Sequence, residues 1–256
     1  MIDADGLLLD LDGTVVLGGQ PVAGAPEAIR AVRQRGIPYR FATNATATTR
    51  TALAAHLTAL GIETEPGDIL TAPVVTAAYL RSHHPDARCL LLGEGGAAED
   101  LEGVELVMDR ADVVIVAGAD RAYTWENLTH AYRMILDGAA IVAMHRNLAW
   151  RTEDGLTLDA GAFLVGLERA AGVEATVIGK PSEAFFRQAV ELLGTPPERT
   201  AIIGDDLDND VLAAQDLGLT GVLVRTGKFR PEMLDASARK PDHVIDSIAD
   251  LSAVLG

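Results

Sequence analysis

Two carboxylates and a hydroxyl follow directly on an apolar run near the start of the chain. The run Leu7-Leu8-Leu9 leads into Asp10, Asp12 and Thr14, and such a run is typical of a strand buried on both faces of a sheet. In open α/β sheets, ligands bind at the carboxyl ends of the strands. An ordinary turn is the alternative, since most loop aspartates form turns. Two neighbouring carboxylates stay ionised only beside cations or hydrogen-bond donors, which favours a catalytic site.

Three further predicted strands end in residues that could meet these aspartates. Thr43, Lys180 and Asp205 each come at the end of a short apolar segment. Because helices connect the strands, we expect parallel strands whose carboxyl ends share one edge of the sheet. For residues 205–210 the alternative is a solvated acidic helix start, which suits the positive end of the helix dipole. The apolar strand before Asp205 instead favours a position beside Asp10.

The acidic residues at these strand ends require a cation. Asp10, Asp12, Asp205, Asp206 and Asp210 offer oxygen ligands, and neither cysteine nor histidine is placed among them. Mg²⁺ prefers oxygen ligands and is typically held by a few carboxylates together with a substrate phosphate, whereas Zn²⁺ favours nitrogen and sulfur. The sequence therefore predicts a Mg²⁺ site that receives a phosphorylated substrate.

The composition indicates a soluble globular protein with enough apolar residues for a core. The chain has 256 residues, of which 48% are hydrophobic, and a formal net charge of −16. This charge disfavours nucleic acid and anionic membranes as partners. The longest apolar run, residues 113–119, is far shorter than the ~20 residues of a membrane span, and the first residues lack the basic start of a signal peptide, so we expect a cytoplasmic protein. A single cysteine, Cys89, allows no intrachain disulfide.

The middle of the chain carries its own pattern of apolar strands and amphipathic helices, enough for a separate small domain. We therefore expect an α/β fold: a Rossmann-like doubly wound parallel sheet from residues 1–72 and 177–256, with an inserted α/β domain over residues 73–176. The run Val177-Ile178 is assigned to the core sheet. Gly93-Glu94-Gly95-Gly96 has neither a dinucleotide fingerprint nor a following Gly-Lys-Ser/Thr, so it is predicted to be a turn before a helix.

Taken together, the strand-end segments resemble the motifs of the haloacid dehalogenase (HAD) superfamily. They occur in order along the whole chain, as Asp10-Leu11-Asp12-Gly13-Thr14, Thr43, Lys180, and Gly204-Asp205-Asp206 with Asp210. The insertion between the second and third motifs is similar to the large α/β cap (C2 type) of subfamily IIA, which includes nucleotide and 4-nitrophenyl phosphatases. Residues 177–182, 203–206 and 224–230 look most like the phospholysine phosphohistidine inorganic pyrophosphate phosphatase branch.

The resemblance implies a Mg²⁺-dependent phosphatase that works through an aspartyl phosphate. Asp10 would attack phosphorus, while Asp12 would protonate the leaving oxygen and later deprotonate water. Asp10, the main-chain carbonyl of Asp12 and Asp205 would bind the metal. The remaining implied roles are binding of the substrate phosphate, by Thr43, Asn44 and Lys180, and support of the metal, by Asp206 and Asp210.

Within the superfamily, the presence of Asp12 distinguishes phosphatases from dehalogenases. Dehalogenases lack an acid at the position of Asp12, because a halide leaves without a proton, and phosphomutases usually carry a helical cap directly after the first motif. Two other classes of function stay open: a phosphoacceptor signalling domain, which would have a single five-strand unit without so large an insertion, and a non-catalytic binding protein on the same fold. Pyrophosphate and phosphoramidates stay open beside phosphomonoesters as substrates.

The strongest candidates for substrate selection in the insertion are His145, Arg146 and Asn147. They follow the predicted strand 140–144, where many members of the subgroup read Thr-Asn-x-Asp. We expect them at a strand end, with Arg146 as a cation for an anionic substrate. The alternative is an ordinary polar turn that leads into Trp150 and a bend at 153–155. The resemblance also implies homodimers formed through the cap.

Overall fold

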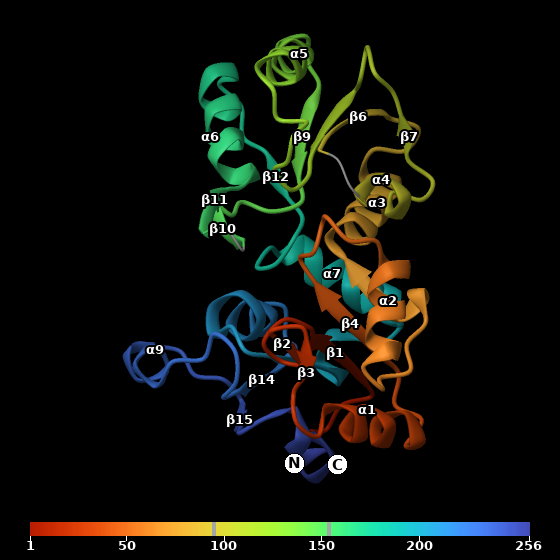
Figure 1. The fold of residues 1–256 in the computed structure, drawn as a ribbon, viewed down its shortest axis with the longest axis vertical. Coiled ribbons are helices and arrows are strands. Elements are labelled where there is room, and N and C mark those ends of the chain that lie inside the picture. The colour runs from red at the N-terminus through yellow and green to blue at the C-terminus, as the bar shows by residue number, and fades with distance from the viewer. Residues whose placement is uncertain (94–95, 153–154) are drawn as a thin grey trace. The chain divides into compact units, whose positions relative to one another are not determined.

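The structure is a computed structural model that describes residues 1–93, 96–152 and 155–256 (Figure 1). The predicted turn at 93–96 and bend at 153–155 therefore lie partly outside the described residues. The chain forms two compact units: the first comprises Met1–Thr43, Arg50–Leu70 and Lys180–Gly256, and the second comprises Asn44–Thr49 and Thr71–Gly179.

The first unit is built on a six-stranded sheet in the order β15-β14-β13-β1-β4-β5. Strands β15, β14, β13, β1 and β4 pair in parallel with their neighbours. Every residue of β1 and β13 is buried, as expected for central strands covered on both faces. The strands are β1 (Gly6–Asp10), β4 (Tyr39–Thr43), β5 (Ile69–Thr71), β13 (Thr200–Gly204), β14 (Thr220–Val224) and β15 (His243–Ile245).

Helices connect these strands, and some of them have recognisable start signals. Pro26 stands in the first turn of α1, and the Ser182 hydroxyl accepts a hydrogen bond from the Phe185 N–H to cap α7. A small hairpin, β2 (Val16–Leu17) with β3 (Gln20–Pro21), follows β1. The helices are α1 (Ala25–Gln34), α2 (Arg50–Ala59), α7 (Glu183–Leu193), α8 (Ala213–Gln215), α9 (Pro231–Ala236) and α10 (Leu251–Val254), with 3₁₀ turns at Pro66–Asp68, Pro197–Arg199 and Ile248–Asp250.

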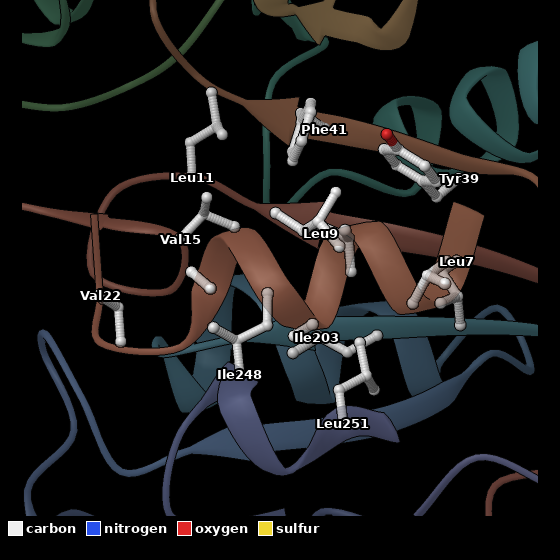
Figure 2. Packing of buried hydrophobic residues seen from close by; sticks show 14 of the residues in the cluster. Leu7, Leu9, Leu11, Val15, Val22, Tyr39, Phe41, Ile203, Ile248 and Leu251 are labelled. Carbon is white, nitrogen blue, oxygen red and sulfur yellow. The ribbon is translucent and has the colours of Figure 1, made fainter. Parts of the chain in front are cut away.

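A hydrophobic core joins one face of this sheet to α1 and the C-terminal helix. Leu7 and Leu9 of β1 lie in this core beside Phe41 of β4 and Ile203 of β13 (Figure 2). Leu251 of α10 belongs to the same core. All five side chains are fully buried. Burial of each such side chain contributes about 1.5–3 kcal/mol. The core thus fixes the strands whose carboxyl ends carry the predicted catalytic residues.

The second unit has its own five-stranded sheet in the order β12-β9-β8-β6-β7, with all neighbours parallel. An antiparallel hairpin of β10 and β11 forms a separate small sheet. The strands are β6 (Arg88–Leu92), β7 (Glu105–Leu106), β8 (Val113–Val116), β9 (Ala140–Ala143), β10 (Ala149–Thr152), β11 (Gly155–Leu158) and β12 (Thr176–Val177), and the helices are α3 (Ala72–His83), α4 (Ala97–Asp100), α5 (Trp125–Leu136) and α6 (Ala160–Ala171).

One strand belongs to a different sheet from the predicted one. The sequence analysis assigns Val177-Ile178 to the core sheet, but β12 pairs in parallel with β9, placing Val177 opposite Ala143. The assignment is wrong because both sheets are parallel and apolar, so two residues carry no pattern that distinguishes them. The first unit resumes at Lys180.

The acidic helix after β13 also differs from a regular α-helix. Leu207–Leu212 form a π-helix that continues into α8, and the Val211 N–H donates to the Asp206 carbonyl at 3.3 Å. Such wide turns are frequent at functional sites.

Among the described residues, no helix is both long enough and apolar enough to cross a membrane.

Candidate active site

Polar side chains from several strand ends of the first unit are buried at the carboxyl edge of its sheet. Asp10 ends β1, Thr43 ends β4, and Asp205 directly follows β13. Lys180 enters from the segment before α7, and its Nζ donates to the carbonyl of Ala42 at 2.9 Å. Asp10, Thr43, Lys180 and Asp205 are only 6%, 3%, 7% and 1% exposed. Burial of so many polar groups requires that they compensate one another.

The Lys180 ammonium links two of the carboxylates. Its Nζ lies 2.6 Å from Asp10 Oδ1 and 2.7 Å from Asp210 Oδ1. With the Ala42 carbonyl as third acceptor, all three ammonium protons have partners. Burial by itself lowers the pKa of Lys180, but the charges and hydrogen bonds of Asp10 and Asp210 raise it above its ordinary value. Lys180 is therefore a permanent cation at this edge.

Three buried carboxylates form a cluster with the chemistry of a hard-cation site. Oxygens of Asp10, Asp205 and Asp210 lie within 4.8 Å of one another. Burial raises the pKa of Asp205 and that of Asp210 to about 6, and it also raises the pKa of Asp10, which the Lys180 charge opposes. Asp205 Oδ1 is buried without a hydrogen-bond partner in the described part of the chain. An all-oxygen donor set with one unsatisfied oxygen fits Mg²⁺.

Hydrogen bonds fix the side chains of Asp206, which adjoins this cluster, and of Asp210, which belongs to it. Asp206 accepts hydrogen bonds from the Asn209 N–H at 3.0 Å and the Asn209 side chain at 2.8 Å. Burial by itself raises the pKa of Asp206, but these hydrogen bonds and the Lys228 ammonium outweigh it, so the pKa lies below its ordinary value. Asp210 uses one oxygen for Lys180 and the other to accept the Asp206 N–H at 3.3 Å. Both residues therefore hold groups of the site in place.

Asp12 is not one of the clustered carboxylates, and Asn44 belongs to the second unit. Asp12 is exposed, and the Gly13 N–H donates to the Val16 carbonyl at 2.7 Å, which turns the chain sharply after it. Asn44 follows Thr43 but groups with the second unit, where a Cβ on Gly179 would lie 2.8 Å from its Oδ1. Because it is exposed, the Asp12 carboxylate is accessible to water.

The three residues predicted for substrate selection follow β9, and two of their side chains are engaged within the second unit. His145 is 4% exposed; its Nδ1 accepts the Asn147 N–H at 3.3 Å, and its Nε2 lies 3.8 Å from Asp159 Oδ1. Burial lowers the pKa of His145, which the Asp159 charge opposes. A neutral ring whose Nδ1 accepts from Asn147 carries its proton on Nε2. Arg146 forms an ion pair with Glu168.

Two further residues contribute to the site: Thr14, which the sequence analysis names without a role, and Lys228, which it does not name. The Thr14 hydroxyl donates to Asp10 Oδ2 at 3.2 Å, so Lys180 and Thr14 hold one oxygen each of Asp10. The Lys228 N–H donates to Asp205 Oδ2 at 2.6 Å. A signal for Lys228 was present, because it follows β14, whose carboxyl end lies on the same edge as that of its parallel neighbour β13.

Known proteins resemble this chain in sequence over nearly its full length. Residues 7–107 match the profile of the family described as haloacid dehalogenase-like hydrolase, and residues 177–251 match a second HAD hydrolase-like profile. The 5'-nucleotidase YutF of Bacillus subtilis (strain 168) is 32% identical over 247 residues, which cover 96% of each chain. This chain belongs to the haloacid dehalogenase-like hydrolase family.

Further comparisons place this HAD-family chain among phosphatases. The phospholysine phosphohistidine inorganic pyrophosphate phosphatase of Rattus norvegicus is 32% identical over 251 residues, covering 96% of this chain and 92% of the relative. The solved p-nitrophenyl phosphatase of Archaeoglobus fulgidus superposes with a TM-score of 0.90 at 31% identity and covers 99% of this chain and 100% of its own. The predicted family, the α/β fold class and the phosphatase class of enzyme are confirmed.

Proposed function

We propose that this HAD-family phosphatase hydrolyses small phosphorylated molecules with Mg²⁺ through an aspartyl phosphate on Asp10. The observation that carries the proposal is the buried cluster of Asp10, Asp205 and Asp210, in which Lys180 compensates two carboxylates and Asp205 Oδ1 has no partner in the described chain. An anionic phosphate is attracted to this edge only if a further cation offsets the three carboxylates. A phosphatase with this geometry therefore needs its metal for substrate binding as well as for rate.

In this mechanism Asp10 is the nucleophile and Asp12 the acid and base. Lys180 and Thr14 orient the Asp10 carboxylate, whose oxygen forms a bond to phosphorus while the bond to the leaving oxygen breaks. Asp12 gives its proton to the leaving oxygen. Asp12 then takes a proton from water, which attacks phosphorus and releases Asp10.

Several groups of the chain stabilise the transferring phosphoryl group. Thr43, Asn44 and Lys180 are proposed to bind its oxygens, so that positioning and charge supply most of the rate enhancement. Mg²⁺, when held by Asp10, Asp205 and the main-chain carbonyl of Asp12, supplies positive charge to those oxygens. Asp206 and Asp210 keep the site in shape.

The proposal extends to substrate class and assembly. The names of the relatives include a nucleotidase, a nitrophenyl phosphatase and a phosphatase of phosphoamino acids and pyrophosphate, so phosphomonoesters, phosphoramidates and pyrophosphate are the substrates to compare. The inserted second unit, predicted over residues 73–176, is proposed to act as the cap. A cytoplasmic location and a homodimer through this unit, on whose α5 Trp125 is 75% exposed, complete the proposal.

The metal is expected to control both activity and stability. EDTA should abolish hydrolysis of 4-nitrophenyl phosphate, and Mg²⁺ should restore it. Asp205 and Asp210 have pKa values of about 6 in the metal-free fold, above the value of about 3.9 for an unfolded aspartate. The free energy of unfolding that they contribute is therefore present below pH 4 and is lost as the pH rises through 6.

Mg²⁺ binding requires the deprotonated carboxylates, so its stabilising effect should grow from pH 5 to pH 7.5. At a concentration 100 times its Kd, the ion should add about 2.7 kcal/mol at the higher pH. Thermal unfolding with EDTA and with Mg²⁺ at both pH values measures this. Full activity in EDTA, or an equal stabilisation by Mg²⁺ at pH 5, would contradict the metal site; phosphorylation without turnover would favour the signalling alternative.

Arg146 is expected to influence the choice of substrate. Arg146→Ala removes a guanidinium paired with Glu168, and we expect kcat/KM for pyrophosphate to fall about tenfold relative to 4-nitrophenyl phosphate, because one charge contact on the leaving group is lost. His145→Ala is a less clean test, since it empties a buried position beside Asp159. Arg133→Ala on α5, also an exposed arginine of the second unit, is the matched control. An unchanged ranking of substrates would assign the selection to other loops.

A further inference from the structure

The segment that follows β14 contacts the site at three points within the first unit. The Thr226 hydroxyl donates to the Gly13 carbonyl, in the loop that carries Asp12. The Lys228 N–H donates to Asp205 Oδ2 at 2.6 Å. The Lys228 ammonium lies 3.2 Å from Asp206 Oδ2. Thr226 and Lys228 thus connect the loop after β1 with the acidic segment after β13.

Two glycines leave the space that the Asp205 carboxylate occupies. A Cβ added to Gly13 would lie 1.9 Å from Asp205 Oδ2, and a Cβ added to Gly227 would also lie 1.9 Å from that oxygen. The same atom on Gly227 would lie 2.6 Å from the Gly13 Cα. All three distances are far below van der Waals contact, so the carboxylate lies between two stretches of backbone that carry no side chain. Gly227 also has a φ of +57°, which glycine adopts most easily.

These contacts determine which oxygen of Asp205 is available to a ligand. Oδ2 is held by the Lys228 N–H, whereas Oδ1 is buried and has no hydrogen-bond partner in the part of the chain that the structure describes. The carboxylate belongs to the cluster with Asp10 and Asp210. If the Asp205 carboxylate rotated or shifted, it would lose its hydrogen bond from the Lys228 N–H or collide with the backbone of Gly13 or Gly227.

We propose that Thr226, Gly227 and Lys228 form a clamp that positions Asp205 to bind the metal. The three are positioning residues, since they act on the metal through Asp205 and Gly13. This inference rests on the proposed function, in which Asp205 is a metal ligand. Groups that orient metal ligands typically contribute 10- to 100-fold to metal affinity, and the clamp is expected to contribute an effect of this size.

Two pairs of variants separate the clamp from general effects on folding. Thr226→Val removes the hydroxyl at nearly constant shape, and Thr226→Ser restores a donor to the Gly13 carbonyl. Gly227→Ala places a methyl group on Asp205, whereas Gly36→Ala introduces a side chain at a similar φ of +71° with nothing within 4 Å. The two glycine variants share the backbone strain, and only the first has the collision.

The test is the Kd of Mn²⁺, measured by electron paramagnetic resonance titration without substrate, together with thermal unfolding in EDTA. Thr226→Val and Gly227→Ala should weaken Mn²⁺ binding about 10- to 100-fold, while Thr226→Ser and Gly36→Ala bind Mn²⁺ like the wild type. If Gly227→Ala does not fold, the Thr226 pair decides alone.

The outcomes distinguish the clamp from the proposed function. Wild-type affinity in Thr226→Val, with Asp205→Asn unable to bind, would overturn the clamp and leave the metal site intact. Equal Mn²⁺ binding by wild type and Asp205→Asn would overturn the assignment of Asp205 itself, and with it both proposals.

Discussion

Asp10→Asn should abolish phosphatase turnover in a protein that still folds. The amide keeps the shape of the carboxylate but loses its charge and nucleophilicity, so kcat for 4-nitrophenyl phosphate should fall by a factor of about 10⁴ to 10⁶. Folding should survive, because Thr14 can still donate to the amide oxygen and one charge is removed from a crowded cluster. Steady-state kinetics and far-ultraviolet circular dichroism measure the two effects.

The matched control for this variant is Asp208→Asn. Asp208 is exposed, two residues beyond Asp206, and its change to asparagine removes the same charge outside the buried cluster. We expect wild-type kcat in this control. Turnover by Asp10→Asn within tenfold of the wild type would exclude Asp10 as the nucleophile.

Lys180→Met should cost both activity and stability. Its Nζ lies 2.6 Å from Asp10 and 2.7 Å from Asp210, all three groups being buried. Removal of one partner from a buried ion pair destabilises a protein by about 3–5 kcal/mol, because the other charge stays buried without compensation. Activity should fall at least about 10³-fold, since the phosphoryl group and two carboxylates would then meet without this cation.

The stability lost in Lys180→Met should depend on pH in a defined direction. Without the ammonium, the pKa values of Asp10 and Asp210 in the fold rise further above that of an unfolded aspartate. Their contribution to the free energy of unfolding is present at low pH and lost as the pH rises, so the deficit should be smaller at pH 5.5 than at pH 8.

Urea unfolding of wild type, Lys180→Met and Lys240→Met at both pH values measures this deficit. Lys240 is exposed, and its ammonium donates to the Leu234 carbonyl, so its replacement should change stability little. A deficit for Lys180→Met that is equal at the two pH values would contradict the charge compensation.

The architecture and the meeting of Asp10, Lys180 and Asp205 at one sheet edge could be predicted because local patterns determine them. The apolar run before Asp10 demands a doubly covered strand, and the helical connections demand parallel strands that share an edge. The pattern of the inserted domain is equally local: α5 (Trp125–Leu136) and α6 (Ala160–Ala171) each carry an apolar face and begin after a capping side chain, Thr124 or Asp159.

The rest depends on contacts that no local pattern encodes. The sheet to which β12 belongs is decided by hydrogen bonds to β9, which lies more than thirty residues earlier in the chain. The Lys228 bond to Asp205 uses a backbone N–H, a group that every residue except proline has, so the position of Lys228 after β14 hints at this contact but its residue type does not. The His145 environment likewise depends on Asp159, which caps α6 after an intervening hairpin.

The most direct test of the central claim is to trap the phosphoenzyme and locate the modified residue. Wild-type protein mixed with Mg²⁺ and 4-nitrophenyl phosphate would be quenched in acid on the millisecond timescale and treated with borohydride, which reduces an aspartyl phosphate to homoserine. Peptide mass spectrometry should then find homoserine at position 10 in the wild type and none in Asp10→Asn. Homoserine at position 12 would contradict the mechanism. So would the absence of any trapped phosphoenzyme when turnover is slow compared with the quench.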